Sequence, residues 1–238
     1  MVFIGSEPNN DYVIAEFEES KEGGNFVLQG PNGHSWQFSS ELQGIYNAQN
    51  SSMALLAAAH AVNKEDISGF LSQANLESYT GVARRQEVLF EDEYLKVIED
   101  FAHHPTAIRL CIDSFRNCYS DSEIVAVFEP RSNTSATNVL QSEFTEALGC
   151  AERVMILPVH RAEVYLDHVR IDTSEMARTL NRGKCQAVAF KDKETLFENL
   201  GCLERNQKRI VLLFTNGSFG EPLLNYLRGL KTEEQDKD

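Results

Sequence analysis

From about residue 85 onward, short apolar runs alternate regularly with longer segments of mixed character. The runs are rich in Val, Ile, Leu and Phe, which is typical of strands buried on both faces. We expect strands at Leu95–Ile98, Ile124–Phe128, Val154–Leu157, Ala187–Phe190 and Ile210–Phe214. Helix-length segments lie between and after them, near residues 105–117, 138–148, 173–182, 193–204 and 221–229. This alternation predicts an α/β fold with a mostly parallel sheet and helices on both faces.

The first 80 residues have a different pattern. Three short alternating runs are separated by Gly-rich turns, which predicts β-hairpins, and these runs are Tyr12–Ala15, Asn25–Leu28 and Ser35–Phe38. Residues 46–76 are helical in character, with a second helix expected from about Lys64 to Gln73. The polar tail, residues 231–238, is expected to be frayed.

Composition excludes several classes of protein. The 238 residues include 22 Lys and Arg against 36 Asp and Glu, a net charge of −14, which argues against binding nucleic acid or an anionic membrane. The five cysteines form no C-x-x-C pair and match no zinc pattern, so we expect reduced thiols and no metal site. The start of the chain does not read as a signal peptide, and no apolar run reaches the ~20 residues that span a bilayer. A cytoplasmic protein is expected.

Polar residues follow the predicted strands. In a parallel α/β sheet, ligands bind outside the carboxyl ends of the strands. Four segments follow the strands: Glu99–Thr106, Glu129–Thr134, Pro158–Arg161 and Thr215–Gly220. Three of them combine charged, amide or hydroxyl groups with Gly or Pro, which is unusual for loops that only connect elements. We therefore expect the functional site at this edge of the sheet.

The first of these segments carries the most chemistry. Asp100 directly follows a strand, so its carboxylate could accept hydrogen bonds from the paired hydroxyls of a ribose. His103 and His104 could donate to a phosphate or stack on a base. The alternative is that Pro105 and Thr106 only begin a helix, while the histidines are solvated.

Two further groups could contact a nucleotide. Asn47 and Asn50 lie three residues apart on one face of the predicted helix, where two amides could satisfy the edge of adenine. Helix capping by Asn47 is the alternative. Arg85, in the run Arg84-Arg85-Gln86-Glu87, could bind a terminal phosphate with its planar fork, or form a surface ion pair with Glu87.

The segment Thr215–Gly220 is a strand-to-helix turn with two glycines, suited to presenting backbone N–H groups to an anion. It is not a Walker A loop, because that motif needs Gly-Lys-Ser/Thr, and no such tripeptide occurs in this chain. Beside it, Arg131 follows another buried strand. Together these two segments could hold a carboxylate. The alternative is that Arg131 only pairs with Glu129 or another carboxylate of the chain, and that the Gly-containing segment is a tight turn.

Taken in order, these motifs resemble the second half of the Mur ligase family. The matching residues are Tyr46-Asn47-x-x-Asn50, Ala57-Ala58-Ala59, Arg84-Arg85-x-Glu87, Asp100-Phe101-Ala102-His103-His104-Pro105-Thr106-Ala107-Ile108 and Asn216-Gly217-Ser218-Phe219-Gly220. The run Phe128-Glu129-Pro130-Arg131-Ser132-Asn133-Thr134 looks most like the recycling branch, the murein tripeptide ligases. The resemblance covers about residues 40–230, and residues 1–39 look like the closing hairpins of the family's central ATPase domain.

The resemblance implies an ATP-dependent amide ligase that joins UDP-N-acetylmuramate to a murein tripeptide during peptidoglycan recycling, with ATP and Mg²⁺ as cofactors of the full-length family. It implies that Asn47 and Asn50 face adenine, Arg85 faces the terminal phosphate and Asp100 faces the ribose, while His103 and His104 line the nucleotide side. The residues toward the incoming peptide would be Arg131, Asn133, Asn216, Ser218 and Phe219.

The resemblance also implies a division into residues 1–84, the end of the central domain; 85–232, the Rossmann-like C-terminal domain; and 233–238, a polar tail. The family's P-loop, magnesium-binding carboxylate, modified lysine and UDP-sugar domain lie upstream of residue 1. We therefore expect no catalytic residue, no tight cofactor binding and no activity from this chain alone, with the missing regions as partners if they are separately encoded. Tyr46 replaces the family's usual His, and Glu221-Pro222 replaces Gly-Ile-His.

Two other hypotheses remain open at this stage. The chain could be a non-catalytic module that keeps the ligand-binding fold and binds a ligand or a partner chain. It could also be a silent remnant that retains only structural integrity. An in-frame Gly-Thr-x-Gly-Lys-Thr upstream would favour the ligase.

Overall fold

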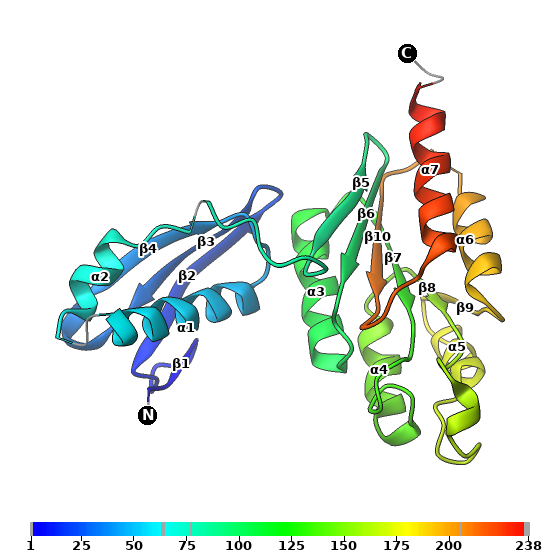
Figure 1. The fold of residues 1–238 in the computed structure, drawn as a ribbon, viewed down its shortest axis with the longest axis horizontal. Helices are drawn as coiled ribbons and strands as arrows, with labels where there is room; N and C mark the ends of the chain where they lie inside the picture. Colours follow the sequence, from blue (N-terminus) through cyan, green and yellow to red (C-terminus); the bar gives the residue numbers. More distant parts are fainter. Residues whose placement is uncertain (1, 63–64, 77, 205, 236–238) are drawn as a thin grey trace. The chain divides into compact units, whose positions relative to one another are not determined.

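The computed structural model describes residues 2–62, 65–76, 78–204 and 206–235 (Figure 1). The chain forms two compact units. The first comprises the residues up to Gly81 together with Asn117–Tyr119. The second comprises Val82–Arg116 and the residues from Ser120 onward.

The first unit is a four-stranded sheet covered by two helices. Its strands are β1 (Ile4–Gly5), β2 (Tyr12–Ser20), β3 (Gly23–Gln29) and β4 (Ser35–Ser40), in the order β1-β2-β3-β4. The pairs β2–β3 and β3–β4 are antiparallel, which confirms the predicted hairpins, and a 3₁₀ turn (Pro31–Gly33) joins β3 to β4. Alternate residues of β3 and β4, Phe26, Leu28, Trp36 and Phe38, are buried in one apolar cluster.

The helices of this unit are α1 (Ile45–Val62) and α2 (Ile67–Gln73). Leu56 of α1 and Leu71 of α2 are buried in the same cluster as the strands. The predicted start of the second helix at Lys64 lies outside the described residues. In the structure α2 begins at Ile67, because the Asp66 side chain caps it by accepting a hydrogen bond from the Gly69 N–H at 2.7 Å.

The second unit is built on a six-stranded sheet in the order β5-β6-β10-β7-β8-β9. Its strands are β5 (Glu87–Glu91), β6 (Leu95–Asp100), β7 (Glu123–Phe128), β8 (Arg153–Ile156), β9 (Gln186–Ala189) and β10 (Arg209–Phe214). All neighbours are parallel except β5 and β6. The five predicted strands and the mostly parallel sheet are confirmed. Strand β5 was not predicted, because it is a short edge strand with only three apolar residues.

Five α-helices connect and follow these strands: α3 (Pro105–Cys118), α4 (Gln141–Leu148), α5 (Thr173–Leu180), α6 (Lys193–Gly201) and α7 (Glu221–Gln235). Two 3₁₀ turns, at Asn138–Leu140 and Ala162–Val164, also occur. The expected end of the last helix near residue 229 was too early, because residues 231–235 continue α7 instead of fraying. The run Lys231-Thr232-Glu233-Glu234-Gln235 contains no Gly or Pro to stop a helix. Residues 236–238 lie outside the described part. Within that part, no helix has the length and apolar character needed to cross a bilayer.

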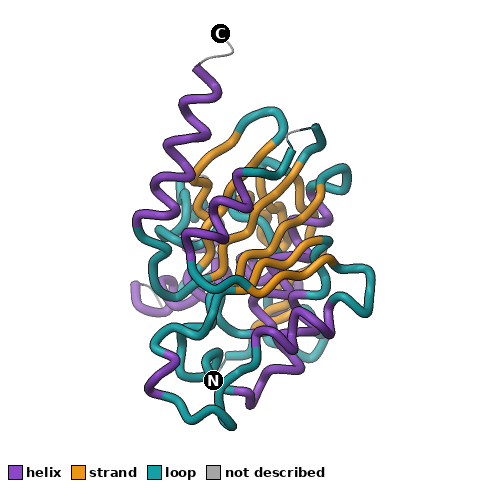
Figure 2. Tube along the Cα trace, turned by 90° about the vertical axis from the view of Figure 1, so that its right-hand side faces the viewer, coloured by secondary structure: helices purple, strands orange, loops and turns teal. Residues whose placement is uncertain are grey.

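The connections decide which face each helix covers. The crossovers β6–α3–β7, β7–α4–β8 and β8–α5–β9 all step in one direction along the sheet, whereas β9–α6–β10 returns. Because such crossovers are right-handed, α6 lies on the face opposite α3, α4 and α5. Packing agrees: Val97 and Val211 share a cluster with Phe197 of α6 and Leu223 of α7. On the other face, Phe128 stacks on Phe144 of α4 at 5.0 Å. The predicted two-sided covering is confirmed (Figure 2).

This topology creates a switch point at the carboxyl edge of the sheet, where adjacent strands lead to opposite faces. Strand β10 lies between β6 and β7. The chain leaves β6 and β7 toward one face, but it leaves β10 toward α7 on the other face. Loops that diverge from adjacent parallel strands in this way leave room for a ligand between them.

Candidate functional site

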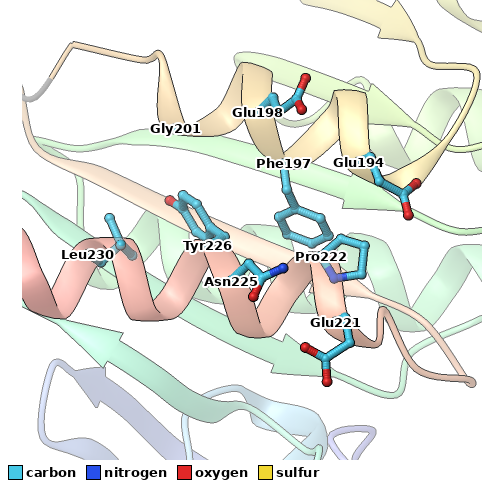
Figure 3. Close-up of a pocket in the computed structure, with 10 residues that line it drawn as sticks. Glu194, Phe197, Glu198, Gly201, Glu221, Pro222, Asn225, Tyr226 and Leu230 are labelled. Carbon is cyan, nitrogen blue, oxygen red and sulfur yellow. The ribbon is translucent and has the colours of Figure 1, made fainter.

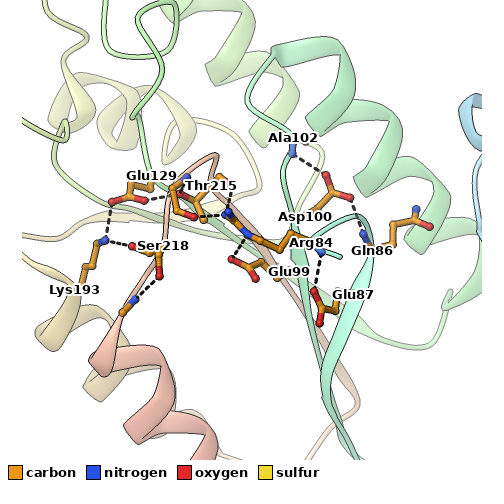
Figure 4. Close-up of polar contacts among 12 residues, drawn as sticks. Arg84, Gln86, Glu87, Glu99, Asp100, Ala102, Glu129, Lys193, Thr215 and Ser218 are labelled. Atoms are coloured by element: carbon orange, nitrogen blue, oxygen red, sulfur yellow. Dashed lines mark hydrogen bonds and ion pairs between the residues drawn. The ribbon is translucent and has the colours of Figure 1, made fainter. Parts of the chain in front are cut away.

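The loops that follow β6, β7 and β10 are bonded to one another at the carboxyl edge (Figure 4). The Thr215 N–H donates to the Asp100 carbonyl at 3.2 Å, and the Glu129 N–H donates to the Phe214 carbonyl at 3.1 Å. These bonds continue the sheet pairing past the ends of the strands. The structure therefore brings together the predicted segments Glu99–Thr106, Glu129–Thr134 and Thr215–Gly220.

Asp100 is buried at the end of β6, with 3% of its surface exposed. One carboxylate oxygen accepts from the Ala102 N–H at 2.7 Å and the other from the Gln86 N–H at 3.0 Å. Burial raises the pKa of Asp100, and the two N–H groups and the charge of Arg85 oppose that rise. In this structure the carboxylate holds two loops in place, and the ribose contact stays a prediction.

Arg84, which the sequence analysis did not select as a site residue, is the most connected side chain at this edge. Its guanidinium forms an ion pair with Glu99 at 3.2 Å, donates to the Thr215 carbonyl at 3.1 Å and also donates to the Gly217 carbonyl. Its backbone is left-handed, with φ at +63°. A left-handed backbone at an arginine whose side chain has three polar partners indicates a position fixed by its surroundings. In the sequence, only its position next to Arg85 in the run Arg84-Arg85-Gln86-Glu87 could have indicated this role.

Arg85, unlike Arg84, has few polar contacts with the rest of the described chain. Its side chain is exposed and its guanidinium lies over the Phe101 ring, 5.3 Å from the centroid. Among the described residues no carboxylate forms an ion pair with it; Glu87 instead accepts from the Arg84 N–H at 2.7 Å. The expected alternative of a surface ion pair between this arginine and Glu87 is therefore not observed. The Arg85 fork remains available to an anion.

The two histidines differ from each other. His103 is partly buried, with its Nδ1 at 2.9 Å from the Phe101 carbonyl and its ring edge-on to Phe101 at 5.3 Å. His104 is exposed, and its Nδ1 accepts from the Thr106 N–H at 3.4 Å at the start of α3. Their contact with a nucleotide stays a prediction.

Glu129, after β7, is the centre of a second cluster and was not selected as a site residue. Its side chain is 2% exposed. One oxygen accepts from the Thr215 hydroxyl; the other lies 2.8 Å from the Lys193 ammonium and 3.7 Å from the Arg131 guanidinium. The Lys193 ammonium also donates to the Ser218 carbonyl at 2.6 Å. No sequence pattern pointed to Lys193, because it reaches the site from the first turn of α6, after β9.

Arg131 lies against the glycine of the β10 loop. A Cβ placed on Gly217 would be 2.1 Å from the Arg131 Nε, so only glycine allows this approach. Burial lowers the pKa of nearby His160, and the positive charges of Arg131, Lys193 and Arg161 contribute to the shift, with Glu129 opposing it. Cations thus gather locally on a chain of net charge −14. Arg131 does approach Glu129, as the alternative proposed, but 3.7 Å is a loose contact.

The other predicted peptide-side residues differ in exposure. The Asn216 Oδ1 is buried without a hydrogen-bond partner in the described part of the chain. Ser218 is exposed, and its hydroxyl accepts from the Gly220 N–H at 3.1 Å. Asn133 is exposed and accepts from the Tyr165 hydroxyl at 3.3 Å. Phe219 is 1% exposed and packs edge-on against Phe197 at 5.6 Å, so it anchors the loop in the core rather than facing a ligand.

Asn47 and Asn50 belong to the first unit, on α1. The Asn47 amide donates to the Gln43 carbonyl at 2.7 Å, a bond back to the preceding turn. Asn50 is exposed. Their contact with adenine stays a prediction. Over the described residues, no three His, Cys, Asp or Glu side chains gather in a way that could hold a metal ion.

Comparison with known proteins identifies one family. Residues 84–217 match the family model described as Mur ligase, glutamate ligase domain. A UDP-N-acetylmuramate–L-alanine ligase of Streptococcus suis is 30% identical over 184 residues, which cover 76% of this chain and 39% of that protein. The chain thus spans about two fifths of the length of this curated relative.

Solved structures share the fold. The UDP-N-acetylmuramate–alanine ligase of Thermotoga maritima superposes with a TM-score of 0.73 at 18% identity, over 100% of this chain and 48% of that one. The murein peptide ligase of Psychrobacter arcticus superposes with a TM-score of 0.62 at 19% identity, over 94% of this chain and 46% of that one.

Proposed function

This chain belongs to the Mur ligase family, because its residues 84–217 match the family's glutamate ligase domain. From that premise we propose that the chain is part of an ATP-dependent ligase that joins UDP-N-acetylmuramate to a murein tripeptide. The observation that carries the proposal is the meeting of three strand-end loops at one edge. Arg131 meets this edge beside Glu129, which also accepts from Thr215 of the Thr215–Gly220 turn. The Arg84-Arg85 segment, which precedes β5, joins the same edge through the Arg84 bonds to the Thr215 and Gly217 carbonyls. These contacts lie within the matched residues 84–217, and the turn ends directly after them.

We propose that Arg85 contacts the terminal phosphate of ATP. Its fork is exposed and stacked on Phe101, which limits its motion without occupying its donors. Asp100 and Arg84 position it: Asp100 holds the Gln86 N–H, and the Phe101 N–H donates to the Arg84 carbonyl at 2.7 Å. ATP would supply the phosphoryl group that activates the muramyl carboxylate, and the peptide amine would then form the amide as phosphate leaves.

We propose that the other side of the edge holds the incoming peptide. Arg131 and Lys193 are cations beside Glu129, and the buried Asn216 Oδ1 is an acceptor that a peptide amide or ammonium could satisfy. A murein tripeptide carries several carboxylates, which such a cluster would attract. The first unit is proposed to be the end of the family's central ATPase domain.

A second candidate acceptor is L-alanine. The relatives reported above from Streptococcus suis and Thermotoga maritima are named as ligases that use alanine. The two candidates share the nucleotide side and differ only in the acceptor, so a binding experiment can separate them.

The test is an NMR titration of the full chain with the tripeptide L-alanyl-γ-D-glutamyl-meso-diaminopimelate and, separately, with L-alanine. We expect the tripeptide, at about 10 mM, to shift the amides of residues 129–134 and 215–219, because binding is millimolar when most ligand contacts lie elsewhere. Arg131→Met removes the shifts, and the matched control Arg178→Met, on α5, keeps them. Shifts with L-alanine alone would identify the second candidate. No shifts with either would contradict the proposal.

A further inference from the structure

A groove of about 390 Å³ runs between α6 and α7, beginning next to the Thr215–Gly220 turn but lined by residues outside the loops described above (Figure 3). Its floor is apolar: Phe197 and Leu230 are buried, and Pro222 and Tyr226 are partly exposed. The Phe197 ring packs against Tyr226 at 5.7 Å and against Phe219 at 5.6 Å. Because these rings hold one another in place, the groove is formed before any ligand arrives.

The rim of the groove is acidic. Glu194 and Glu198 come from α6, and Glu221 comes from α7. None of the described residues that line the groove is basic. Within the described residues Glu194 and Glu198 form no ion pair, whereas Glu221 lies 3.6 Å from the Arg228 guanidinium with both side chains largely exposed. Two of the three rim carboxylates, Glu194 and Glu198, therefore keep their negative charge without a partner in the described part, and the exposed Glu221 pair is weak enough to be exchanged for another cation.

We propose that this groove binds a short basic segment of another protein that carries apolar anchor residues. The proposal goes beyond the ligase function and does not depend on it. Apolar side chains of the segment would cover the Phe197–Tyr226 floor, and its Lys or Arg side chains would meet the three carboxylates. An amphipathic helix with apolar residues four positions apart has this arrangement on one face.

Charge argues against the other occupants. A second copy of this chain also carries a net charge of −14, which opposes self-association. An anionic lipid surface would be repelled by the same carboxylates. A neutral apolar compound would use the floor but would gain nothing from Glu194 and Glu198.

Gly229 offers a way to close the groove without disturbing the fold. It lines the groove within α7, and a Cβ placed there meets no atom within 4 Å. A side chain at this position is therefore tolerated. Both Ala and Leu have a higher helix propensity than glycine, so neither substitution should destabilise α7. Gly229→Leu fills the space, while the matched control Gly229→Ala leaves most of it open.

The probe is a fluorescein-labelled 12-residue helical peptide with Leu at i and i+4 and Lys on the flanking positions, measured by fluorescence anisotropy with the full chain. We expect Gly229→Leu to weaken binding at least tenfold and Gly229→Ala less than twofold. Glu194→Gln and Glu198→Gln should each weaken binding about two- to fivefold, as surface ion pairs do. Glu163→Gln, at an exposed position outside the groove, should leave binding unchanged.

Four results would overturn the proposal. The first is no binding of the probe. The second is equal binding of a peptide with Ser in place of Leu, which would reveal charge attraction only. The third is equal binding of a peptide with Glu in place of Lys, which would indicate an apolar-ligand site. The fourth is a dimer in sedimentation that Gly229→Leu abolishes. Failure here leaves the tripeptide titration untouched, because that titration reads the 129–134 and 215–219 loops.

Discussion

The two ends of the same parallel sheet carry charge in different ways. At the amino edge, Glu123 at the start of β7 accepts from the Arg209 Nε at 2.6 Å, the Arg153 Nε at 3.3 Å and the Gln207 Nε2 at 2.8 Å. Next to it, Arg116 and Glu152 pair at 2.6 Å, and a Glu152 oxygen also accepts from the Ile124 N–H at 2.9 Å. Each of these arginines has a carboxylate partner within the network. We call such a network closed, because its charged groups are satisfied by one another.

The carboxyl edge is not closed. Arg84 and Gln86 have left-handed backbones, at φ +63° and +53°. The Asn216 Oδ1 is buried without a partner in the described residues, and Arg85 lacks an ion pair there. One buried carboxylate, Glu129, is shared between two cations.

This contrast separates an edge whose ion pairs are satisfied internally from the edge that we propose binds a ligand. Ion networks that only tie strand starts together can satisfy every group internally. Strain, unpaired polar atoms and spare donors cost free energy, and they cluster where a ligand completes them. The same contrast predicts that mutations at the amino edge change stability alone, whereas mutations at the carboxyl edge change binding more than stability.

The largest effect on stability is expected from Glu123→Ala at the amino edge. It leaves Arg209, which is 7% exposed, without its carboxylate, and breaking a buried pair from one side costs about 3 kcal/mol. Thermal unfolding should shift down by roughly 6–12 °C. The tripeptide-induced NMR shifts should be unchanged. The double variant Glu123→Ala/Arg209→Met should recover much of the loss, and a loss from the single variant below about 1 kcal/mol would contradict the closed-network interpretation.

Arg84→Lys should have an intermediate effect, at the carboxyl edge. A lysine cannot reach Glu99, the Thr215 carbonyl and the Gly217 carbonyl at once, so we expect a loss of about 1–2 kcal/mol and faster amide exchange at Gly217. Denaturant unfolding and hydrogen exchange provide the measurements.

Arg85→Lys is the matched control, because Arg85 is exposed. Its stability change should stay within about 0.5 kcal/mol. Equal losses for the two variants would show that Arg84 does not hold the loop.

Gly217→Ala should change stability less and ligand binding more. The new Cβ would lie 2.1 Å from the Arg131 Nε, and a flexible side chain can move aside for less than about 1 kcal/mol. The displaced guanidinium should weaken the tripeptide titration at least fivefold. In Gly217→Ala/Arg131→Met the clash is gone, so stability should return. A stability loss that persists in the double variant would place the strain in the backbone instead.

The smallest effect concerns His160. Burial and the charges of Arg131, Lys193 and Arg161 lower its pKa below 6.5, while Glu129 opposes the shift. Below pH 6.5 the unfolded chain therefore binds more protons than the folded one, and this residue's contribution to stability falls as the pH drops toward the folded pKa. An NMR titration of the imidazole should show a higher pKa in Lys193→Met and a lower one in Glu129→Gln. Unchanged values would separate His160 from the cluster.

The sequence determined the repeating elements of the second unit. Short, β-branched apolar runs such as Ile124–Phe128 and Ile210–Phe214 favour strands buried on both faces, and their spacing leaves room for one crossover helix each. The hairpins of the first unit followed from alternation and Gly-rich turns. The edge strand β5 was missed, because pairing with β6, rather than its own composition, makes it a strand.

At the site, the sequence indicated which loops lie at the edge of the sheet, but not which side chains pair with one another there. The rule that ligands bind at strand ends selected Asp100, Arg131 and Asn216 correctly as edge residues. It could not find Arg84 or Lys193 as the residues that hold that edge. Lys193 is 64 residues from Glu129 in the chain and meets it only because β9–α6 returns to β10.

It also could not separate Ser218 from Phe219, which are adjacent in the sequence. One is exposed at the loop and the other is buried against Phe197. Local pattern fixes which residues lie on one strand or one turn, because the backbone period is local. Which side chains pair across loops depends on strand order and on packing between elements, and only the tertiary structure decides those.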